Sequence, residues 1–363
     1  MPSRRIDLCG VRIDLETDHA ELARYVAAQF PDAPDADAEP DVVVRVRWTE
    51  GPRPVLDPAT VFPAWRAETR VDRHVFLGTD AILCLQADDA PQIALASAPG
   101  RPRRFELRYH FALGAGWRAS LTRAVRWRRV RTLRRSRLST LVYYAVYYPA
   151  WWHLEARGGA HPLHAAAIAL GGRALLLGGL PGCGKSTLAT SFLGAADAEL
   201  LSDNVVLHDA ARVHGCFEPL LLDATTRTSL SGRAPLTPLG RRHVYGRDAY
   251  LAPHRTGGVP LAAAVVVARG RETRLTRLTS EECAGLLLAV SEAAKEVRRY
   301  HVLAALLGVL ERDALAHFGQ RVADLQRLLA GVPCYWLQVR EGAPAEATPV
   351  LRELVRPAQE AAG

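Results

Sequence analysis

The feature that most constrains this chain is a glycine-rich loop at residues 179–187, with the sequence GLPGCGKST. The loop matches the pattern G-x-x-x-x-G-K-S/T at every position. Residues 173–177 before it are mostly apolar and predict a buried strand, and residues 187–193 after it predict a helix. A strand, a glycine loop and a helix in this order predict an α/β domain whose loop amides surround a phosphate group.

The residue types in the loop predict how a nucleotide would be held. Lys185 is expected to reach the β- and γ-phosphates, and Ser186 to ligate Mg²⁺. Lysine occurs only at Lys185 and Lys295 in a chain with many arginines, which indicates a position where a compact point charge is needed. The expected ATP-binding residues are Gly179, Gly182, Cys183, Gly184, Lys185, Ser186 and Thr187.

Composition excludes several classes of protein. The 363 residues are 49% apolar and carry a net charge of +8, which suits one large or two modest globular domains. The six cysteines lack C-x-x-C spacing, which argues against a zinc site or a disulfide framework and for a reducing compartment. The first residues lack a signal-peptide pattern and no run of about 18 apolar residues exists, so we expect a cytoplasmic protein.

Patterning along the chain predicts four segments. Residues 1–110 alternate as strands around one helix and predict a smaller α+β domain of unknown role. Residues 111–159 form a basic and aromatic helical connector, and residues 160–345 contain recurrent apolar strands and helices that predict an α/β domain with a mixed sheet. Residues 346–363 are expected to be a C-terminal helix or tail.

The connector combines a basic stretch with an aromatic one. No acidic residue occurs between Glu106 and Glu155, and arginines are dense from Arg118 to Arg137. The stretch is interpreted either as a surface for an anionic partner or as a solvated helix of an arginine-rich chain, and the second is favoured. We predict no nucleic-acid partner. The tyrosines and tryptophans of residues 138–154 suit a helix packed in the core better than one on a membrane surface.

An acidic residue follows the loop closely. The apolar segment 198–202 ends at Asp203, only 18 residues after Lys185. A carboxylate at the end of a strand beside the loop suits a ligand for Mg²⁺, or a base that takes a proton from an attacking hydroxyl. The alternative is an aspartate that caps a turn.

Three features together resemble the HPr kinase/phosphorylase catalytic domain and its stand-alone relatives. They are His164, placed 15 residues before Gly179, the loop itself, and the segment SDNVV at residues 202–206, which stands where the family has A-D-D-x-V. The resemblance covers residues 160–345 and implies the mixed-sheet fold of that domain. It implies an ATP- and Mg²⁺-dependent kinase that phosphorylates a serine or threonine of a peptide or protein. It assigns Asp203 as the general base and His164 as an active-site residue, with Lys185 stabilising the transferred group and Ser186 and Asp203 at the metal.

The chain also departs from the family. Asn204 replaces the second aspartate, and neither the family's downstream glycine-rich segments nor its usual N-terminal half is found, so HPr is not the expected acceptor. A nucleotide-binding regulatory protein and a plain ATPase therefore remain as alternatives to the kinase. The family commonly assembles into rings, so a homo-oligomer is allowed by the resemblance. Further candidates are Arg241, Arg242 and Arg247 for the phosphoryl group, and Asp209, Glu218 and Asp223 for the metal.

Overall fold

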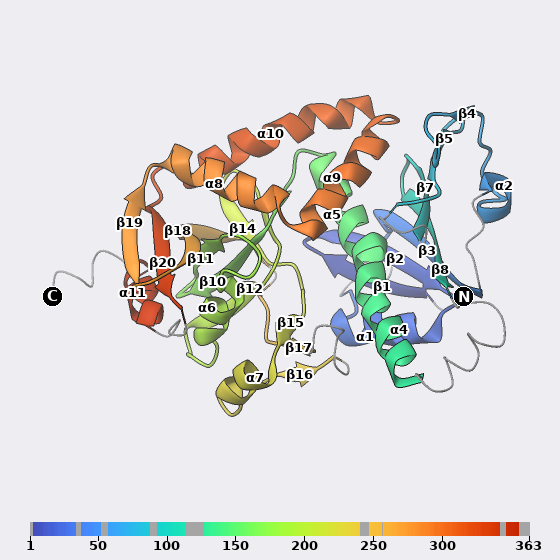
Figure 1. Cartoon of the computed structure of the whole chain (residues 1–363). Coiled ribbons are helices and arrows are strands. Elements are labelled where there is room, and N and C mark those ends of the chain that lie inside the picture. Colours follow the sequence, from blue (N-terminus) through green and yellow to red (C-terminus); the bar gives the residue numbers. More distant parts are fainter. Residues whose placement is uncertain are drawn as a thin grey trace. The chain divides into compact units, whose positions relative to one another are not determined.

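The computed structural model of the chain describes residues 3–33, 38–51, 57–87, 93–112, 127–239, 247–255, 257–341 and 346–355. These residues form two compact units, each described below by itself (Figure 1). The first unit contains Met1–Arg157, Arg241–Gly246 and Arg299–Ala316, and the second contains the rest of the chain. None of the helices in the described ranges is both long and apolar enough to cross a membrane.

The first unit is built on a mixed sheet. Its strand order is β1-β2-β3-β8-β7-β6-β5-β4, and β2, β3 and β8 are parallel neighbours. Alternate residues of β2 are buried, as the apolar–polar alternation of residues 11–15 predicts. The strands are β1 (Ser3–Leu8), β2 (Val11–Thr17), β3 (Val42–Gly51), β4 (Thr69–Arg70), β5 (Val75–Leu77), β6 (Ile82–Cys84), β7 (Ile93–Ala98) and β8 (Arg103–Ala112).

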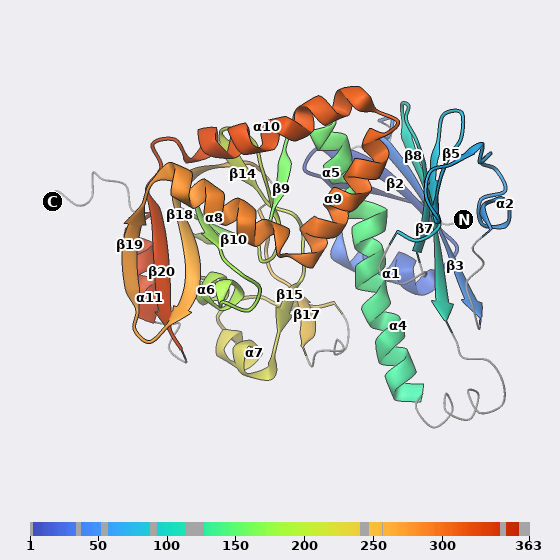
Figure 2. The ribbon, with the colours of Figure 1, turned by 45° about the horizontal axis from the view of Figure 1, so that its top comes forward.

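Helix α1 packs against β2, and η1 and α5 pack against both β2 and β3 (Figure 2). The aromatic stretch continues from α4 through the π-helical η1 into α5, and its side chains at Tyr144, Tyr147, Tyr148, Trp151 and Trp152 are all at most 1% exposed. The expectation that this stretch packs in the core is therefore confirmed. The helices are α1 (Ala20–Gln29), α2 (Pro58–Val61), α4 (Trp127–Val142), η1 (Tyr143–Tyr147) and α5 (Tyr148–Glu155). Arg118, Arg123 and Arg126 of the basic stretch lie outside the described residues.

The second unit is built on a second mixed sheet, with the order β12-β10-β11-β18-β14-β13-β9 and with β20 and β19 joined to β18. In it β11, β18 and β20 are parallel, and β10 is antiparallel to both β11 and β12. The strands are β9 (His161–Leu163), β10 (Ala165–Leu170), β11 (Arg173–Gly178), β12 (Ala198–Ser202), β13 (Val206–His208), β14 (Arg212–His214), β18 (Val259–Gly270), β19 (Arg274–Leu278) and β20 (Cys334–Arg340).

Helices cover both faces of this sheet, as Figure 1 shows for α8 and α10 on one side and α6 and α11 on the other. Alternate residues of β10 contribute to two separate cores, with Ile168 on the α6 side and Ala167 on the α8 side. The arrangement is an α/β fold with a mixed sheet, as the sequence predicts. The helices are α6 (Lys185–Ser191), α7 (Ala224–Leu230), α8 (Ser280–Glu292), α11 (Ala347–Glu353) and most of α10 (Arg312–Leu329), whereas most of α9 (Lys295–Gly308) belongs to the first unit, which includes Arg299–Ala316.

The structure also contains elements that the apolar–polar pattern of the sequence does not specify. Residues 280–292 and 295–308 form two helices, α8 and α9, separated by a turn at residues 293–294. Residues 312–321 form the first part of α10. A small antiparallel sheet of β15 (Leu220–Leu222), β17 (Asp248–Leu251) and β16 (Thr237–Pro238) was not predicted, because its strands are too short for alternation to be read.

Candidate functional site

The glycine-rich loop joins β11 to α6 in a conformation that depends on its glycines. Gly179, Gly182 and Gly184 have φ angles of 140°, 83° and 109°, in the left-handed region that side chains disfavour. A Cβ atom added at Gly179 would lie 2.5 Å from the carbonyl oxygen of Val267 and 2.7 Å from Sγ of Cys183. The backbone at Gly179 therefore approaches β18 more closely than any other residue type permits.

Lys185 closes the loop on itself. Its ammonium group donates to the carbonyl oxygens of Gly179 at 2.7 Å and Leu180 at 3.2 Å, and the residue is 5% exposed. Burial lowers the pKa of Lys185, and the neighbouring Cys183 and Asp203 oppose that shift. The positive charge is thus held inside the loop, next to the end of β12.

Sheet register brings the three motifs of the sequence to one edge. β10 lies between β11 and β12 and is antiparallel to both, so β11 and β12 run in the same direction. Ala165 pairs with Gly178 at the end of β11, and Ala167 pairs with Ser202 at the end of β12. His164, the residue before β10, therefore lies at the edge of the sheet where β11 leads into the loop and β12 leads into Asp203.

Asp203 is buried beside the loop, with 7% of its surface exposed. Its carboxylate accepts a hydrogen bond from the Ser186 side chain, while Oδ1 has no hydrogen-bond partner among the described residues. Burial raises the pKa of Asp203, and Ser186, Lys185 and Arg247 oppose the rise. A carboxylate whose pKa is raised is a stronger base than an exposed one, and an oxygen without a hydrogen-bond partner is available to accept a proton.

His164 is 4% exposed and is held through its backbone, whose N–H donates to Oγ of Ser291 in α8 at 2.9 Å. Burial, followed by the charge of Lys185, lowers the pKa of His164 to about 3, against a small opposing effect of the Asn204 backbone. The imidazole is therefore neutral at physiological pH. Ser291 is 127 residues away along the chain, and no pattern in the sequence marks it.

Glu218 organises the turn that carries Asp203. The residue is 2% exposed, and its carboxylate accepts from the Ser202 hydroxyl at 3.1 Å and the Val205 backbone N–H at 2.7 Å. The Asn204 amide approaches the other oxygen at 3.5 Å. These contacts lie on both sides of Asp203 in the sequence. The sequence suggests Glu218 only as an alternative metal ligand, and in the structure Glu218 supports the turn.

The remaining candidates are used in different ways. Asp209 accepts from the backbone of Ala211 and Arg212 in the β13–β14 hairpin, and Asp223 caps α7 by accepting from Thr226 N–H. Arg247 is exposed, and its charge acts on both Asp203 and Asp223. Arg241 and Arg242 lie outside the described residues.

Within the described ranges no group of three or more His, Cys, Asp or Glu side chains gathers as a metal site. A divalent cation at this edge would therefore be held by Ser186, Asp203 and the phosphate oxygens of a bound nucleotide. Such a mixed set suits Mg²⁺, which is usually held by one or two protein oxygens together with substrate phosphates.

Comparison with known proteins found neither a protein-family model nor a curated protein that matches this chain.

Proposed function

We propose that the protein is an ATP-dependent kinase that transfers the γ-phosphoryl group to a hydroxyl group, most naturally a serine or threonine of a peptide or protein. The observation that supports this proposal is that Oδ1 of Asp203, buried beside the Ser186 hydroxyl and the Lys185 ammonium group, has no hydrogen-bond partner in the described parts of the chain. A phosphate-binding loop needs no such carboxylate in order to bind nucleotide, whereas phosphoryl transfer to a hydroxyl benefits from a base.

The residues at this edge fit MgATP. Glycine amides of the loop would surround the phosphates, and Ser186 and Asp203 would hold the cation. Bound Mg²⁺ neutralises negative charge on the phosphates. The Lys185 ammonium group, which now donates to two loop carbonyls, would transfer those hydrogen bonds to phosphate oxygens.

Asp203 has two functions in this proposal. Ser186 orients its carboxylate, and Oδ1 accepts the proton of the acceptor hydroxyl as the hydroxyl oxygen attacks the γ-phosphorus atom. The bond from that phosphorus to the bridging β–γ oxygen breaks, and ADP leaves. The raised pKa of Asp203 favours this proton transfer, because base strength increases with pKa. His164, neutral and at the same edge of the sheet as Asp203, would supply a polar group that carries no charge.

The test is incubation of the purified protein with γ-labelled ATP, Mg²⁺ and the peptides or proteins encoded beside its gene, analysed by intact mass. Asp203→Asn should still bind ATP and should lose the mass gain of one phosphoryl group on the acceptor. Glu199→Gln is the matched control, because Glu199 is on the same strand but pairs with Arg255 at the surface. Normal phosphorylation by Asp203→Asn would show that the assignment of the base is wrong.

Asn204 favours a second candidate, a nucleotide-binding regulatory protein or an ATPase. An amide is a weaker metal ligand than a carboxylate, and the Asn204 amide already approaches Glu218. Tight ATP binding without turnover would indicate a regulatory protein. Release of phosphate in proportion to ATP consumed, with no phosphorylated product, would indicate an ATPase.

A further inference from the structure

Arg103, at the start of β8 in the first unit, is a buried cation with unused hydrogen-bonding capacity. The residue is 9% exposed, and its guanidinium lies 5.6 Å from the centre of the Trp152 ring. Nη2 forms an ion pair with Glu311, but Nε and Nη1 have no hydrogen-bond partner among the described residues. The great majority of buried N–H groups in proteins have a hydrogen-bond partner, so these two nitrogens indicate an acceptor that the described residues do not provide.

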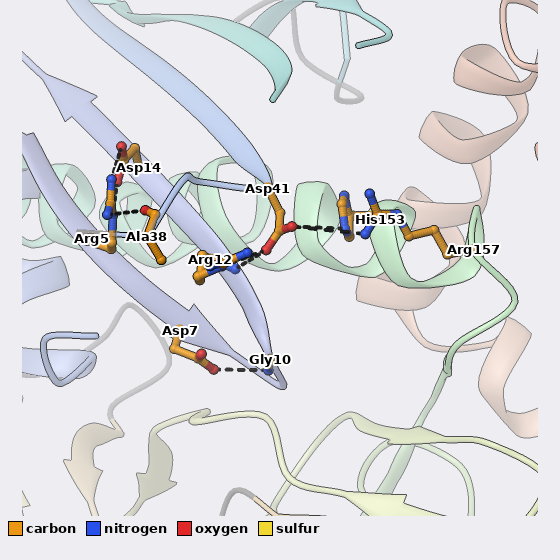
Figure 3. A network of polar contacts seen from close by, with 9 residues as sticks. All are labelled: Arg5, Asp7, Gly10, Arg12, Asp14, Ala38, Asp41, His153 and Arg157. Atoms are coloured by element: carbon orange, nitrogen blue, oxygen red, sulfur yellow. Dashed lines mark hydrogen bonds and ion pairs between the residues drawn. The ribbon is translucent and has the colours of Figure 1, made fainter. Parts of the chain in front are cut away.

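Other basic groups surround the same end of the sheet. The Arg103 backbone N–H donates to the carbonyl of Asp41 at 3.0 Å, which places the two residues side by side. The Asp41 carboxylate binds Arg12 through Nε at 3.2 Å and lies 3.9 Å from Nε2 of His153 and 4.0 Å from Nη1 of Arg157 (Figure 3). Three guanidinium groups thus share two carboxylates, Asp41 and Glu311, which leaves an excess of positive charge.

The pKa of His153 reflects this excess of positive charge. The residue is 7% exposed, and burial, followed by the charge of Arg157, lowers the pKa of His153 to about 4. Arg103 and Arg101 lower the pKa further, and Asp41 opposes the shift. The separation of 3.9 Å from Asp41 is too long for a hydrogen bond. The imidazole is therefore neutral, and an added negative charge would favour its protonation.

We infer that Arg103, Arg157 and His153 form a binding site for one oxyanion group, a phosphate or a carboxylate. Arg103 supplies buried donors on Nε and Nη1, and the half-exposed Arg157 supplies a charge that solvent reaches. Guanidinium groups hold phosphate and carboxylate by charge-assisted hydrogen bonds. All these residues belong to the first unit, so the inference does not depend on the function proposed for the glycine-rich loop.

The test uses the full-length protein with Lys185→Ala, which removes the positive charge of the glycine-rich loop at residues 179–187 from the measurement. Inorganic phosphate and acetate are titrated separately, with chloride at equal ionic strength as the blank, and binding is followed as the rise in the unfolding temperature. At least one anion should bind. Adding Arg157→Gln should weaken that binding about tenfold, the loss expected for one charge-assisted hydrogen bond.

Arg45→Gln is the matched control, because Arg45 is an exposed arginine of β3 paired with Glu16 in the same unit. It should leave anion binding unchanged. Arg157 is preferred to Arg103 for the test because its side chain is 49% exposed, so its loss does not leave a buried carboxylate unpaired. Equal binding by Arg157→Gln and Arg45→Gln, or no response to either anion, would overturn the inference.

A second measurement follows His153 by nuclear magnetic resonance, with the signal assigned by its loss in His153→Gln. The bound anion should raise the pKa of His153 above about 4, because the negative charge stabilises the imidazolium. A response to phosphate alone identifies a phosphate site, and a response to acetate alone identifies a carboxylate site. An unchanged pKa at an anion concentration that stabilises the protein would place the anion elsewhere and overturn the inference.

Discussion

At the scale of single residues, the Asp203 side chain in the turn after β12 has a different partner from its sequence neighbours. Ser202, Asn204 and Val205 all approach Glu218, while Asp203 between them interacts with Ser186 instead. The orientation of the proposed base therefore depends on a carboxylate that does not contact it. This arrangement also gives a physical reason for asparagine at position 204, because an aspartate there would bring a second negative charge to Glu218.

Asn204→Asp should consequently destabilise the protein, by about 2 kcal/mol, although it restores the acid of the resembled family. The double variant Asn204→Asp with Glu218→Gln should recover part of this loss, because the repulsion is gone and an amide can donate to the new carboxylate. Urea unfolding of the single and double variants measures the coupling free energy. Strictly additive effects of the two substitutions would show that the two side chains do not interact.

His164 predicts a pH dependence of stability. Its pKa is lowered to about 3 in the folded protein from 6.5, so the unfolded chain binds the proton first as pH falls. Stability should therefore be complete above about pH 6.5 and should decrease toward pH 3, by at most about 1.4 kcal/mol per pH unit.

His164→Gln should flatten the stability profile across that pH range, as measured by urea unfolding at a series of pH values. His153, with a pKa of about 4, contributes in the same direction, so His153→Gln serves as the comparison. A profile for His164→Gln as steep as that of the unmodified protein would mean that His164 titrates normally.

At the scale of elements, α8 positions the site from the opposite face of the sheet to α6. Its Ser291 holds the backbone of His164, and its N-terminus is fixed by a capping box. There the Thr279 hydroxyl accepts from the Glu282 N–H at 3.1 Å, and the Glu282 carboxylate accepts from the Thr279 N–H at 2.8 Å. Two of the N–H groups at the helix start that lack an intrahelical partner are thus satisfied reciprocally.

Thr279→Ala should lower the free energy of unfolding by about 1 kcal/mol, because one N–H of the first turn loses its acceptor. ATP affinity should not change, since the cap lies at the end of α8 away from Ser291 in the sequence. Denaturant unfolding measures the loss of stability, and nucleotide titration measures the affinity for ATP. Glu281→Gln, in the same turn but outside the capping box, is the control and should have a smaller effect on stability.

At the scale of the whole molecule, the first unit is completed by residues from late in the chain. Residues 299–316 belong to it, and they supply the partners of two buried groups. The Tyr300 hydroxyl donates to the fully buried Glu155 at 2.5 Å, and Glu311 pairs with Arg103 and accepts from the Trp152 indole at 3.3 Å.

A fragment of residues 1–157 should accordingly fail to form native tertiary structure, because it exposes an apolar face and loses the partners of Glu155 and Arg103. Near-ultraviolet circular dichroism is suited to the measurement, since Trp151 and Trp152 are fully buried in the intact protein. Tyr300→Phe and Glu311→Gln in the full chain show how much each contact contributes to the native tertiary structure. A fragment with the native spectrum would show that residues 299–316 are dispensable.

The sequence by itself determined the local features of this protein. Glycines at 179, 182 and 184, apolar residues before them and a helical pattern after them predict a strand, a loop and a helix, and these are present as β11, the loop and α6. The burial of the aromatic stretch and the α/β class were also predicted. Each depends on neighbours a few residues apart, which a periodic pattern records.

Only the tertiary structure decided which distant residues meet. The insertion of β10 between β11 and β12 brings His164 and Asp203 to the start of the loop, and the sequence spacing alone does not require that register. The support of Asp203 by Glu218, the Ser291 contact and the place of residues 299–316 in the first unit were not predicted. Each is a contact between segments whose separation leaves no periodic trace, so it is set by how the whole chain packs.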